Sequence, residues 1–410
     1  MRETLTSASG DAGRRFAAGD GLRALAALSV AAYHAAFLAL IFDGATEHPP
    51  SFDLYGGSAL PFVLHNLDLG LYVFFVLSGY LIARPYIRAY VAGHPAPDWR
   101  RYARNRMLRI VPAFWAVYTV MLLAHGTAGD SAGQILAVYG FAQLWEPGTT
   151  ALYVGPAWTL GVEIAFYLLV PVAALAAHRL SPPAWTPARR SAAVLGAAGT
   201  VTAASLLARA LGPQTPGFGG SLPALAFAFM PGVALATAEV TIRPRLDPRR
   251  LRAVGLAAMA LGAGALLAAA LVPVGRHEFG PQIPAARALL ATLAAGLLIA
   301  AALLREWRGL RPIRLLDNRP ILMLGLWSYS IYLIHQGLYF GLDSLSNRAG
   351  PRESLIVLVA IGLPLVVGAA AISYALVERP ALERRLPWRN RRAPVRAGAE
   401  AAVAVARSRP

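Results

Sequence analysis

Long apolar stretches separated by short polar segments run through most of this chain. Ten of them are long enough to cross about 30 Å of hydrocarbon as a helix. A shorter apolar patch, residues 133–146, cannot cross and predicts a re-entrant or interfacial helix. We therefore expect an all-α, polytopic membrane helix bundle. The ten expected spans are residues 22–42, 67–88, 110–126, 156–178, 191–211, 222–242, 253–274, 285–304, 320–341 and 354–377.

The arginines between these stretches predict how the spans are oriented. Cytoplasmic loops of membrane proteins are enriched in basic residues, and with the N-terminus inside, 33 of the 38 arginines fall in cytoplasmic segments. Counting 133–146 as a full span would reverse every later loop and break that pattern. We expect both termini to be cytoplasmic, with an N-terminal segment at 1–20, a transmembrane domain at 21–380 and a basic tail at 381–410 that ends in disorder.

Composition narrows the class of protein further. The chain has 410 residues, of which 57% are hydrophobic and only 14% charged, as expected for a protein whose partner is the lipid bilayer. Its net charge is +17, but the arginines lie between apolar runs rather than on one helix face, so we expect no nucleic-acid partner. Cysteine is absent, which excludes a thiolate nucleophile and a disulfide framework, and the eight histidines are scattered, so we expect no metal site.

Ionisable residues inside apolar spans are costly and usually functional. Arg23 and His34 stand eleven residues apart, which places them on one stripe of a helix, about 16 Å apart along its axis. Glu163 lies about seven residues from the outer edge of another expected span, residues 156–178. A lone buried carboxylate takes up a proton unless a cation or hydrogen-bond donors hold it charged, so we expect a partner such as His34 or an arginine.

Other polar positions allow two interpretations each. Arg106 and Arg109, three residues apart, can grip phosphate oxygens or simply reflect the cytoplasmic bias for arginine. Ser78 with its neighbouring glycine is typical of close helix packing. A polar band at 325–336 indicates a water-lined cavity, although its hydroxyls can also bond to their own helix. Trp158 and Tyr167 suit interfacial packing as well as substrate stacking.

Six short motifs follow one another along the chain: Arg23-x10-His34, Asp68 to Gly79, Arg106-x-x-Arg109 before Pro112, Trp158-Thr159-Leu160-x-x-Glu163, Ser328 to His335, and Glu378-x-Pro380. In this order they resemble the integral-membrane acyltransferase family 3, bacterial O-acyltransferases that modify sugars, envelope polysaccharides and some secondary metabolites. Thr159 replaces the commoner serine of the fourth motif but keeps the hydroxyl. A second R-x-x-R at Arg101 and Arg104 competes with the one we assign.

The resemblance implies a multi-pass enzyme of the inner (plasma) membrane. Such an enzyme would transfer an acyl group, often acetyl, from cytoplasmic acyl-CoA to a hydroxyl of a carbohydrate, glycolipid or glycosylated metabolite. Arg23, Arg106 and Arg109 would hold the phosphates of the donor at the inner mouth. The thin pantetheine arm of the donor would then run outward along the helix to His34. The eleven-residue spacing would thus match the distance between the phosphates and the thioester of the donor.

His34 has two possible roles in this chemistry. It can act as a general base toward the acceptor hydroxyl, which we favour, or as a nucleophile that carries the acyl group. Glu163 would orient the imidazole or stabilise its positive charge. The remaining expected substrate-binding residues line the acceptor side or donate to the developing oxyanion: Ser78, Trp158, Ser328, Tyr329 and His335.

A rival interpretation is a secondary transporter or flippase for a lipid-linked or polar glycoconjugate. Such proteins also place buried polar residues around a central cavity. A covalent product distinguishes the two classes, because a transporter moves its substrate unchanged.

Overall fold

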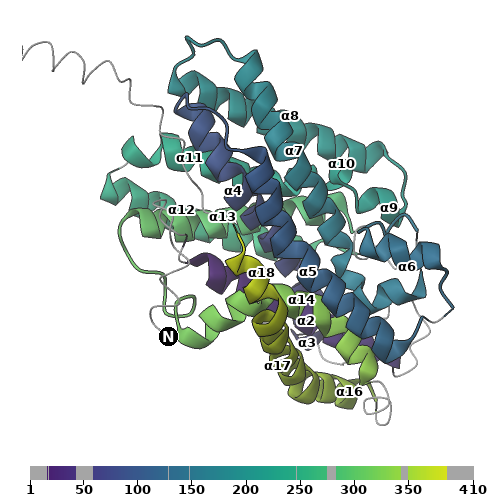
Figure 1. Cartoon of the computed structure of the whole chain (residues 1–410). Coiled ribbons are helices and arrows are strands. Elements are labelled where there is room, and N and C mark those ends of the chain that lie inside the picture. The colour runs from purple at the N-terminus through teal and green to yellow at the C-terminus, as the bar shows by residue number, and fades with distance from the viewer. Residues whose placement is uncertain are drawn as a thin grey trace, which may run out of the picture. The chain divides into compact units, whose positions relative to one another are not determined.

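The helices follow the apolar stretches of the sequence (Figure 1). The computed structural model describes residue 16 and residues 18–42, 59–127, 129–146, 148–245, 247–274, 283–342 and 350–385. Ten helical segments are long and apolar enough to cross a membrane. No strand occurs in the described ranges. These observations confirm the expected all-α, polytopic bundle.

The helices have the following bounds. The longest are α2 (Ala18–Phe42), α4 (Leu71–Val91), α5 (Trp99–His125), α7 (Trp158–Leu180), α8 (Pro187–Leu211), α12 (Pro248–Leu271), α13 (Ala285–Trp307) and α14 (Arg319–Gly341). The shorter ones are α3 (Ala59–Asn66), α6 (Ala132–Tyr139), α9 (Pro216–Gly219), α10 (Leu222–Leu225), α11 (Met230–Thr241), α16 (Pro351–Val357), α17 (Leu363–Ser373) and α18 (Arg379–Glu383). Short 3₁₀ and π-helical segments link them: η2 (Leu67–Gly70), η3 (Thr149–Ala157), η4 (Ala226–Phe229), η5 (Arg243–Arg245), η7 (Leu358–Gly362) and η8 (Tyr374–Glu378).

Several helices extend beyond the apolar runs that predicted them. We expected a span from residue 110, but α5 begins at Trp99 because the Asp98 side chain caps it by accepting from the Arg100 amide at 2.9 Å. Arginine is a good helix former, so the charged residues that end a hydrophobic run do not end the helix. The first three turns of α5 therefore carry the arginine cluster, through Arg109, in helical geometry.

The patch at 133–146 forms one short helix. α6 spans eight residues, about 12 Å, and is too short to cross a membrane. A capping box at Ser131 and Gln134 fixes its start. The expected short extra helix is thus present at Ala132–Tyr139, and the following residues turn back toward η3.

The centre of the bundle is built on close helix contacts. α14 packs against α2 and α17, and α4 packs against α11. At Gly79 an added methyl group would overlap the carbonyl oxygen of Phe229, and at Gly232 it would overlap the carbonyl oxygen of Val76. These two glycines let the backbones of α4 and α11 touch.

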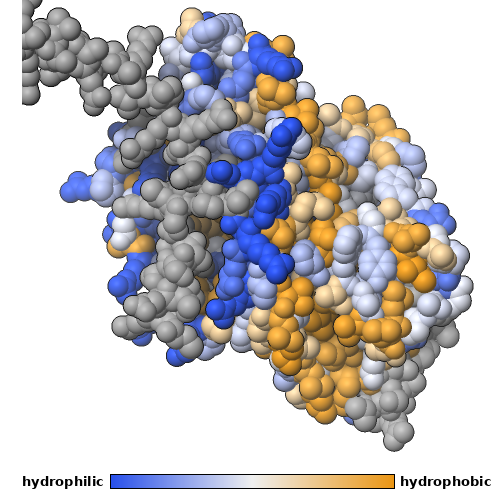
Figure 2. Space-filling model, viewed as in Figure 1, coloured by the Kyte–Doolittle hydropathy of each residue, from blue (hydrophilic) through white to orange (hydrophobic). Residues whose placement is uncertain are grey.

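The surface separates into apolar and polar zones. Figure 2 shows a broad hydrophobic surface over the right side of the view, with hydrophilic residues gathered in a band to its left. Residues 16–385 form one compact unit. The expected N-terminal segment and basic tail lie outside the described residues except for Phe16, Ala18–Asp20 and Ala381–Arg385, so the predicted domain limits stay predictions.

Candidate functional site

A cavity opens among five helices of the bundle. It encloses about 810 Å³ of empty space, part of it open to solvent. Three arginines line it: Arg23 of α2 and Arg106 and Arg109 of α5. Arg101 and Arg104 are not among its lining residues, which favours Arg106 and Arg109 as the functional pair. α4, α7 and α14 complete the wall with Ser78, Thr159, Glu163, Tyr167, Ser328, Tyr329, Tyr332 and several apolar side chains.

Two of the three arginines pair directly with an acidic residue. Arg23 pairs with Asp20 at 3.2 Å, and Arg109 lies 3.5 Å from Glu378, whose other oxygen accepts from Ser330 at 2.6 Å. The guanidinium of Arg109 also faces the ring of Tyr329, 5.8 Å from its centroid. These contacts fix the direction of the N–H groups, as recognition of an anion requires.

Glu163 positions the third arginine indirectly. Its carboxylate accepts from the hydroxyls of Ser78 and, at 2.5 Å, Tyr167. The ring of Tyr167 in turn lies beneath the guanidinium of Arg106, 5.3 Å away. Two hydroxyl donors and the nearby cations supply the partners that a buried carboxylate needs.

Arg385, just past the last span, adds a fourth cation near this end of the cavity. Burial and the like charges of Arg109 and Arg106 lower the pKa of Arg385 to about 9, so its guanidinium stays charged at neutral pH. Four guanidinium groups therefore meet three carboxylates here. No motif or spacing in the sequence distinguishes Arg385 from the other basic residues of the tail.

Aromatic and hydroxyl side chains close the other end of the cavity. The Tyr332 hydroxyl donates to the Pro156 carbonyl at 2.7 Å and lies 2.9 Å from the Thr159 hydroxyl. Phe74 packs edge-on against Tyr332, with ring centroids 5.7 Å apart. This group of side chains forms the floor of the cavity.

Two histidines lie behind that floor. His335 is fully buried on α14, with its ring 6.0 Å from that of Tyr332, and its Nε2 is 3.2 Å from Nδ1 of the half-buried His34. The sequence placed both residues in the site but did not predict that they touch. They are 301 positions apart, so no local spacing could show it.

The hydrogen bonds of this pair determine which nitrogens carry protons when both rings are neutral. Nδ1 of His335 lies 3.0 Å from the Ile331 carbonyl, so it donates there and leaves Nε2 as an acceptor. Nδ1 of His34 faces that acceptor and the Val30 carbonyl at 2.9 Å, so it must be the protonated nitrogen of its ring. Nε2 of His34 therefore holds the free lone pair.

The structure departs from three sequence-based expectations. Glu163 does not contact His34, so its expected role of orienting the imidazole is not supported by its contacts, which are to Ser78 and Tyr167. The expected open channel from Arg23 to His34 is interrupted, because Tyr332 and Phe74 lie at the end of the cavity and His34 is not among its lining residues. Trp158 is not a lining residue either, and its ring lies beside Gly220.

Other predicted residues lie at the cavity with their hydroxyls already engaged. Ser328 donates to the Gly325 carbonyl of its own helix at 2.8 Å, and Tyr329 donates to the Ile110 carbonyl at 2.8 Å. As they stand, these hydroxyls can accept a hydrogen bond from a substrate but cannot donate one to an oxyanion. Tyr332 belongs to the same polar band one helical turn further along, but the sequence assigns it no role in the site.

Within the ranges given above, no cluster of three or more histidine or acidic side chains is placed to hold a metal ion. The arrangement instead offers oriented cations, a carboxylate with two hydroxyl donors, and an imidazole with a free lone pair.

One of three comparisons with known proteins identifies a family for this chain. No curated protein and no solved structure matches the chain. The family model described as an acyltransferase domain, acyltransferase family 3, matches residues 16–377, which includes the cavity and both histidines. The chain therefore belongs to acyltransferase family 3 and is a multi-pass membrane acyltransferase.

Proposed function

We propose that this enzyme transfers an acyl group, acetyl in the simplest case, from cytoplasmic acyl-CoA to a hydroxyl of a carbohydrate or glycosylated acceptor. The observation that carries the proposal is the cavity, with three oriented guanidinium groups at one end and the His34–His335 pair behind the other. Acyl-CoA has matching chemistry, since its phosphates lie at one end of a thin arm and its thioester at the other. We assign the arginine-rich end to the cytoplasmic side of the inner membrane.

His34 is the proposed general base. Its free Nε2 takes the proton of the acceptor hydroxyl while the acceptor oxygen attacks the thioester carbonyl. The carbon–oxygen bond forms, the carbon–sulfur bond breaks, and the protonated imidazole returns the proton to the departing CoA thiolate. His335 accepts from Nδ1 of His34 and so keeps the lone pair on the nitrogen that reacts.

The thioester must pass Tyr332 to reach His34. On this proposal Tyr332 rotates away from Pro156 and Thr159, which costs its hydroxyl hydrogen bonds, each worth about 1 kcal/mol. The acyl group then stands beside the imidazole while the phosphates remain among the arginines. Tyr332 is thus a gate between donor and acceptor sides.

The test is acyl transfer by the purified enzyme and its His34→Ala variant. With acetyl-CoA and an extract of envelope glycans, mass spectrometry should find an acetylated product for the wild type and at least about a hundredfold less for His34→Ala. His178→Ala is the matched control, because the Nδ1 of His178 also bonds the carbonyl four residues earlier, at 2.8 Å. Transfer by His34→Ala at the wild-type rate would refute the proposal. Flux of unmodified substrate into vesicles would instead support a transporter.

A further inference from the structure

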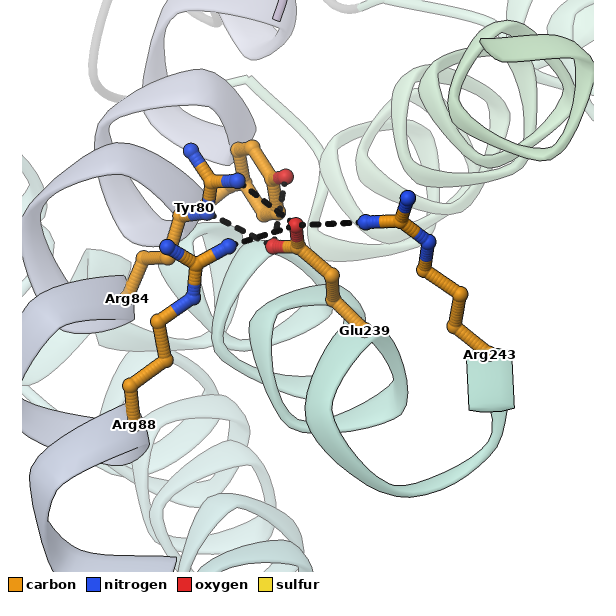
Figure 3. Close-up of polar contacts among 5 residues, drawn as sticks. All are labelled: Tyr80, Arg84, Arg88, Glu239 and Arg243. Carbon is orange, nitrogen blue, oxygen red and sulfur yellow. Dashed lines mark hydrogen bonds and ion pairs between the residues drawn. The ribbon is translucent and has the colours of Figure 1, made fainter. Parts of the chain in front are cut away.

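A second group of arginines surrounds one carboxylate away from the cavity (Figure 3). Glu239 of α11 is 5% exposed. It accepts from Arg84 through Nε and Nη2, both at 2.6 Å, from Arg88 at 2.8 Å and from the Tyr80 hydroxyl at 2.9 Å. Arg243 completes the group at 3.6 Å. We call these five residues the Glu239 cluster.

The Glu239 cluster carries an excess of positive charge. Among the described side chains, Glu239 is the one carboxylate that contacts these three guanidinium groups, and their mutual repulsion is stronger where water is partly excluded. Arg84 is mostly buried, whereas the side chains of Arg88 and Arg243 are 37% and 27% exposed. Within the described part of the chain, the guanidinium of Arg88 hydrogen-bonds only Glu239, and that of Arg243 makes only its ion pair with Glu239. Both therefore present donors at the surface to an anion.

The Glu239 cluster continues a line that begins in the cavity. Leu77, Leu81, Arg84 and Arg88 follow one another at intervals of four, three and four residues, so they share one face of α4. Leu77 and Leu81 line the cavity. At 1.5 Å per residue, Arg84 and Arg88 lie about 5 and 10 Å further along the helix axis than Leu81.

A shallow hollow adjoins the exposed edge of the Glu239 cluster. It measures about 520 Å³ including its open side, and Val91, Ala92, Val240 and Pro244 are among its apolar lining residues. All four lie within about one helical turn, or four residues along the chain, of Arg88 or Arg243. Oriented guanidinium groups beside an apolar surface suit a ligand that combines phosphate with a flat, weakly polar ring.

We propose that the Glu239 cluster binds a phosphate of the nucleotide portion of the CoA donor, with the adenine ring against the neighbouring hollow. This inference rests on the proposed function. CoA carries phosphate on the ribose as well as the diphosphate of its arm, so it offers anions at separate positions. Arg23 and Arg109 of the cavity each have a carboxylate of their own. In the Glu239 cluster three arginines contact one carboxylate, and the partly exposed Arg88 and Arg243 can bind a further phosphate.

Direct binding of two ligands tests the proposal. Free CoA and 4′-phosphopantetheine, which lacks the nucleotide, are titrated calorimetrically into the purified full-length protein. For Arg88→Ala and for Arg243→Ala we expect the Kd for CoA to rise about tenfold, the loss expected for one charge-assisted hydrogen bond. The Kd for 4′-phosphopantetheine should not change.

Arg249→Ala provides the matched control. Arg249 is an exposed arginine six residues along the chain from Arg243, and its substitution removes the same charge. It should leave both Kd values unchanged. An unchanged Kd for CoA in Arg88→Ala and Arg243→Ala, or an equal rise for both ligands, would overturn the proposal. So would an effect of Arg88→Ala seen only in nanodiscs containing phosphatidylglycerol, because the site would then belong to a lipid headgroup.

The same measurements separate this inference from the proposed function. If CoA binds with the predicted dependence on Arg88 and no acyl product forms with any acceptor, the proposed function fails and the nucleotide site stands. If acetyl-CoA supports transfer and Arg88→Ala leaves the CoA affinity intact, only the nucleotide site fails.

Discussion

The arginines of the cavity and those of the Glu239 cluster differ in how they are paired with carboxylates. In the cavity, Arg23 and Arg109 each pair with a separate carboxylate, Asp20 and Glu378. In the cluster, Arg84 and Arg88 both bond one carboxylate, Glu239. The first arrangement orients each guanidinium with little net charge, and the second concentrates charge around a single buried acid.

The number of arginines alone therefore does not describe an anion site. The balance between guanidinium and carboxylate decides how strongly a region attracts a phosphate, whereas the pairing decides where the donors point. On the proposed function, the cavity aligns the donor and the cluster contributes attraction. Four predictions test this contrast.

The largest effect is expected on stability from Glu239→Ala. The variant leaves three cations without their carboxylate, and removing one partner of a buried pair typically costs about 3–5 kcal/mol. Thermal unfolding in detergent should show a clear fall in Tm. Asp20→Ala, whose partner Arg23 has a side chain 28% exposed, should show a much smaller fall. Equal falls would mean that the two regions do not differ in this way.

Arg23→Ala should act on donor binding rather than on folding. Loss of a charge-assisted contact to phosphate corresponds to roughly a ten- to hundredfold rise in the KM for acetyl-CoA, with a smaller change in kcat. Steady-state kinetics of CoA release measure both, with Arg249→Ala as control. A wild-type KM would remove Arg23 from the donor site.

Glu163→Gln should have a smaller effect of the same kind. The amide oxygen can still accept from Tyr167, so Arg106 stays near its position but loses a nearby negative charge. We expect the KM for acetyl-CoA to change by about threefold, with kcat nearly constant. A fall in kcat of about a hundredfold would assign Glu163 a direct part in the chemistry instead.

Glu383→Ala should produce the smallest effect. Its pair with Arg379 is exposed, at 64% and 58% of the two side chains, and such pairs are screened by water and salt. The free energy of unfolding should stay within about 0.5 kcal/mol of the wild type. A larger loss of stability would show that burial of the acid does not determine how much such a pair stabilises the protein.

The spans and the cavity arginines could be predicted because their signals are local. A run of apolar residues and a three-residue arginine spacing act within one helix, and Arg106 and Arg109 indeed face the same cavity. The start of α5 could not be read from hydropathy, because the cap at Asp98 and the helix preference of arginine set it.

The pairings could not be predicted because they join distant segments. Glu239 lies 155 positions from Arg84, in a helix whose sequence shows no charge pattern that points to α4. The same holds for His335 and His34. Glu163 was expected to need a partner, and it has two, but periodicity could not distinguish hydroxyl donors from an imidazole.

The close approach of α4 and α11 at Gly79 and Gly232 also determines the geometry of the Glu239 cluster. Arg84 and Glu239 extend from the same two backbones, only five and seven residues from these glycines. The distance between the two helices therefore sets the length of the salt bridges. One extra methyl group would push the helices apart, and on the proposed nucleotide site it would weaken phosphate binding without changing a charged residue.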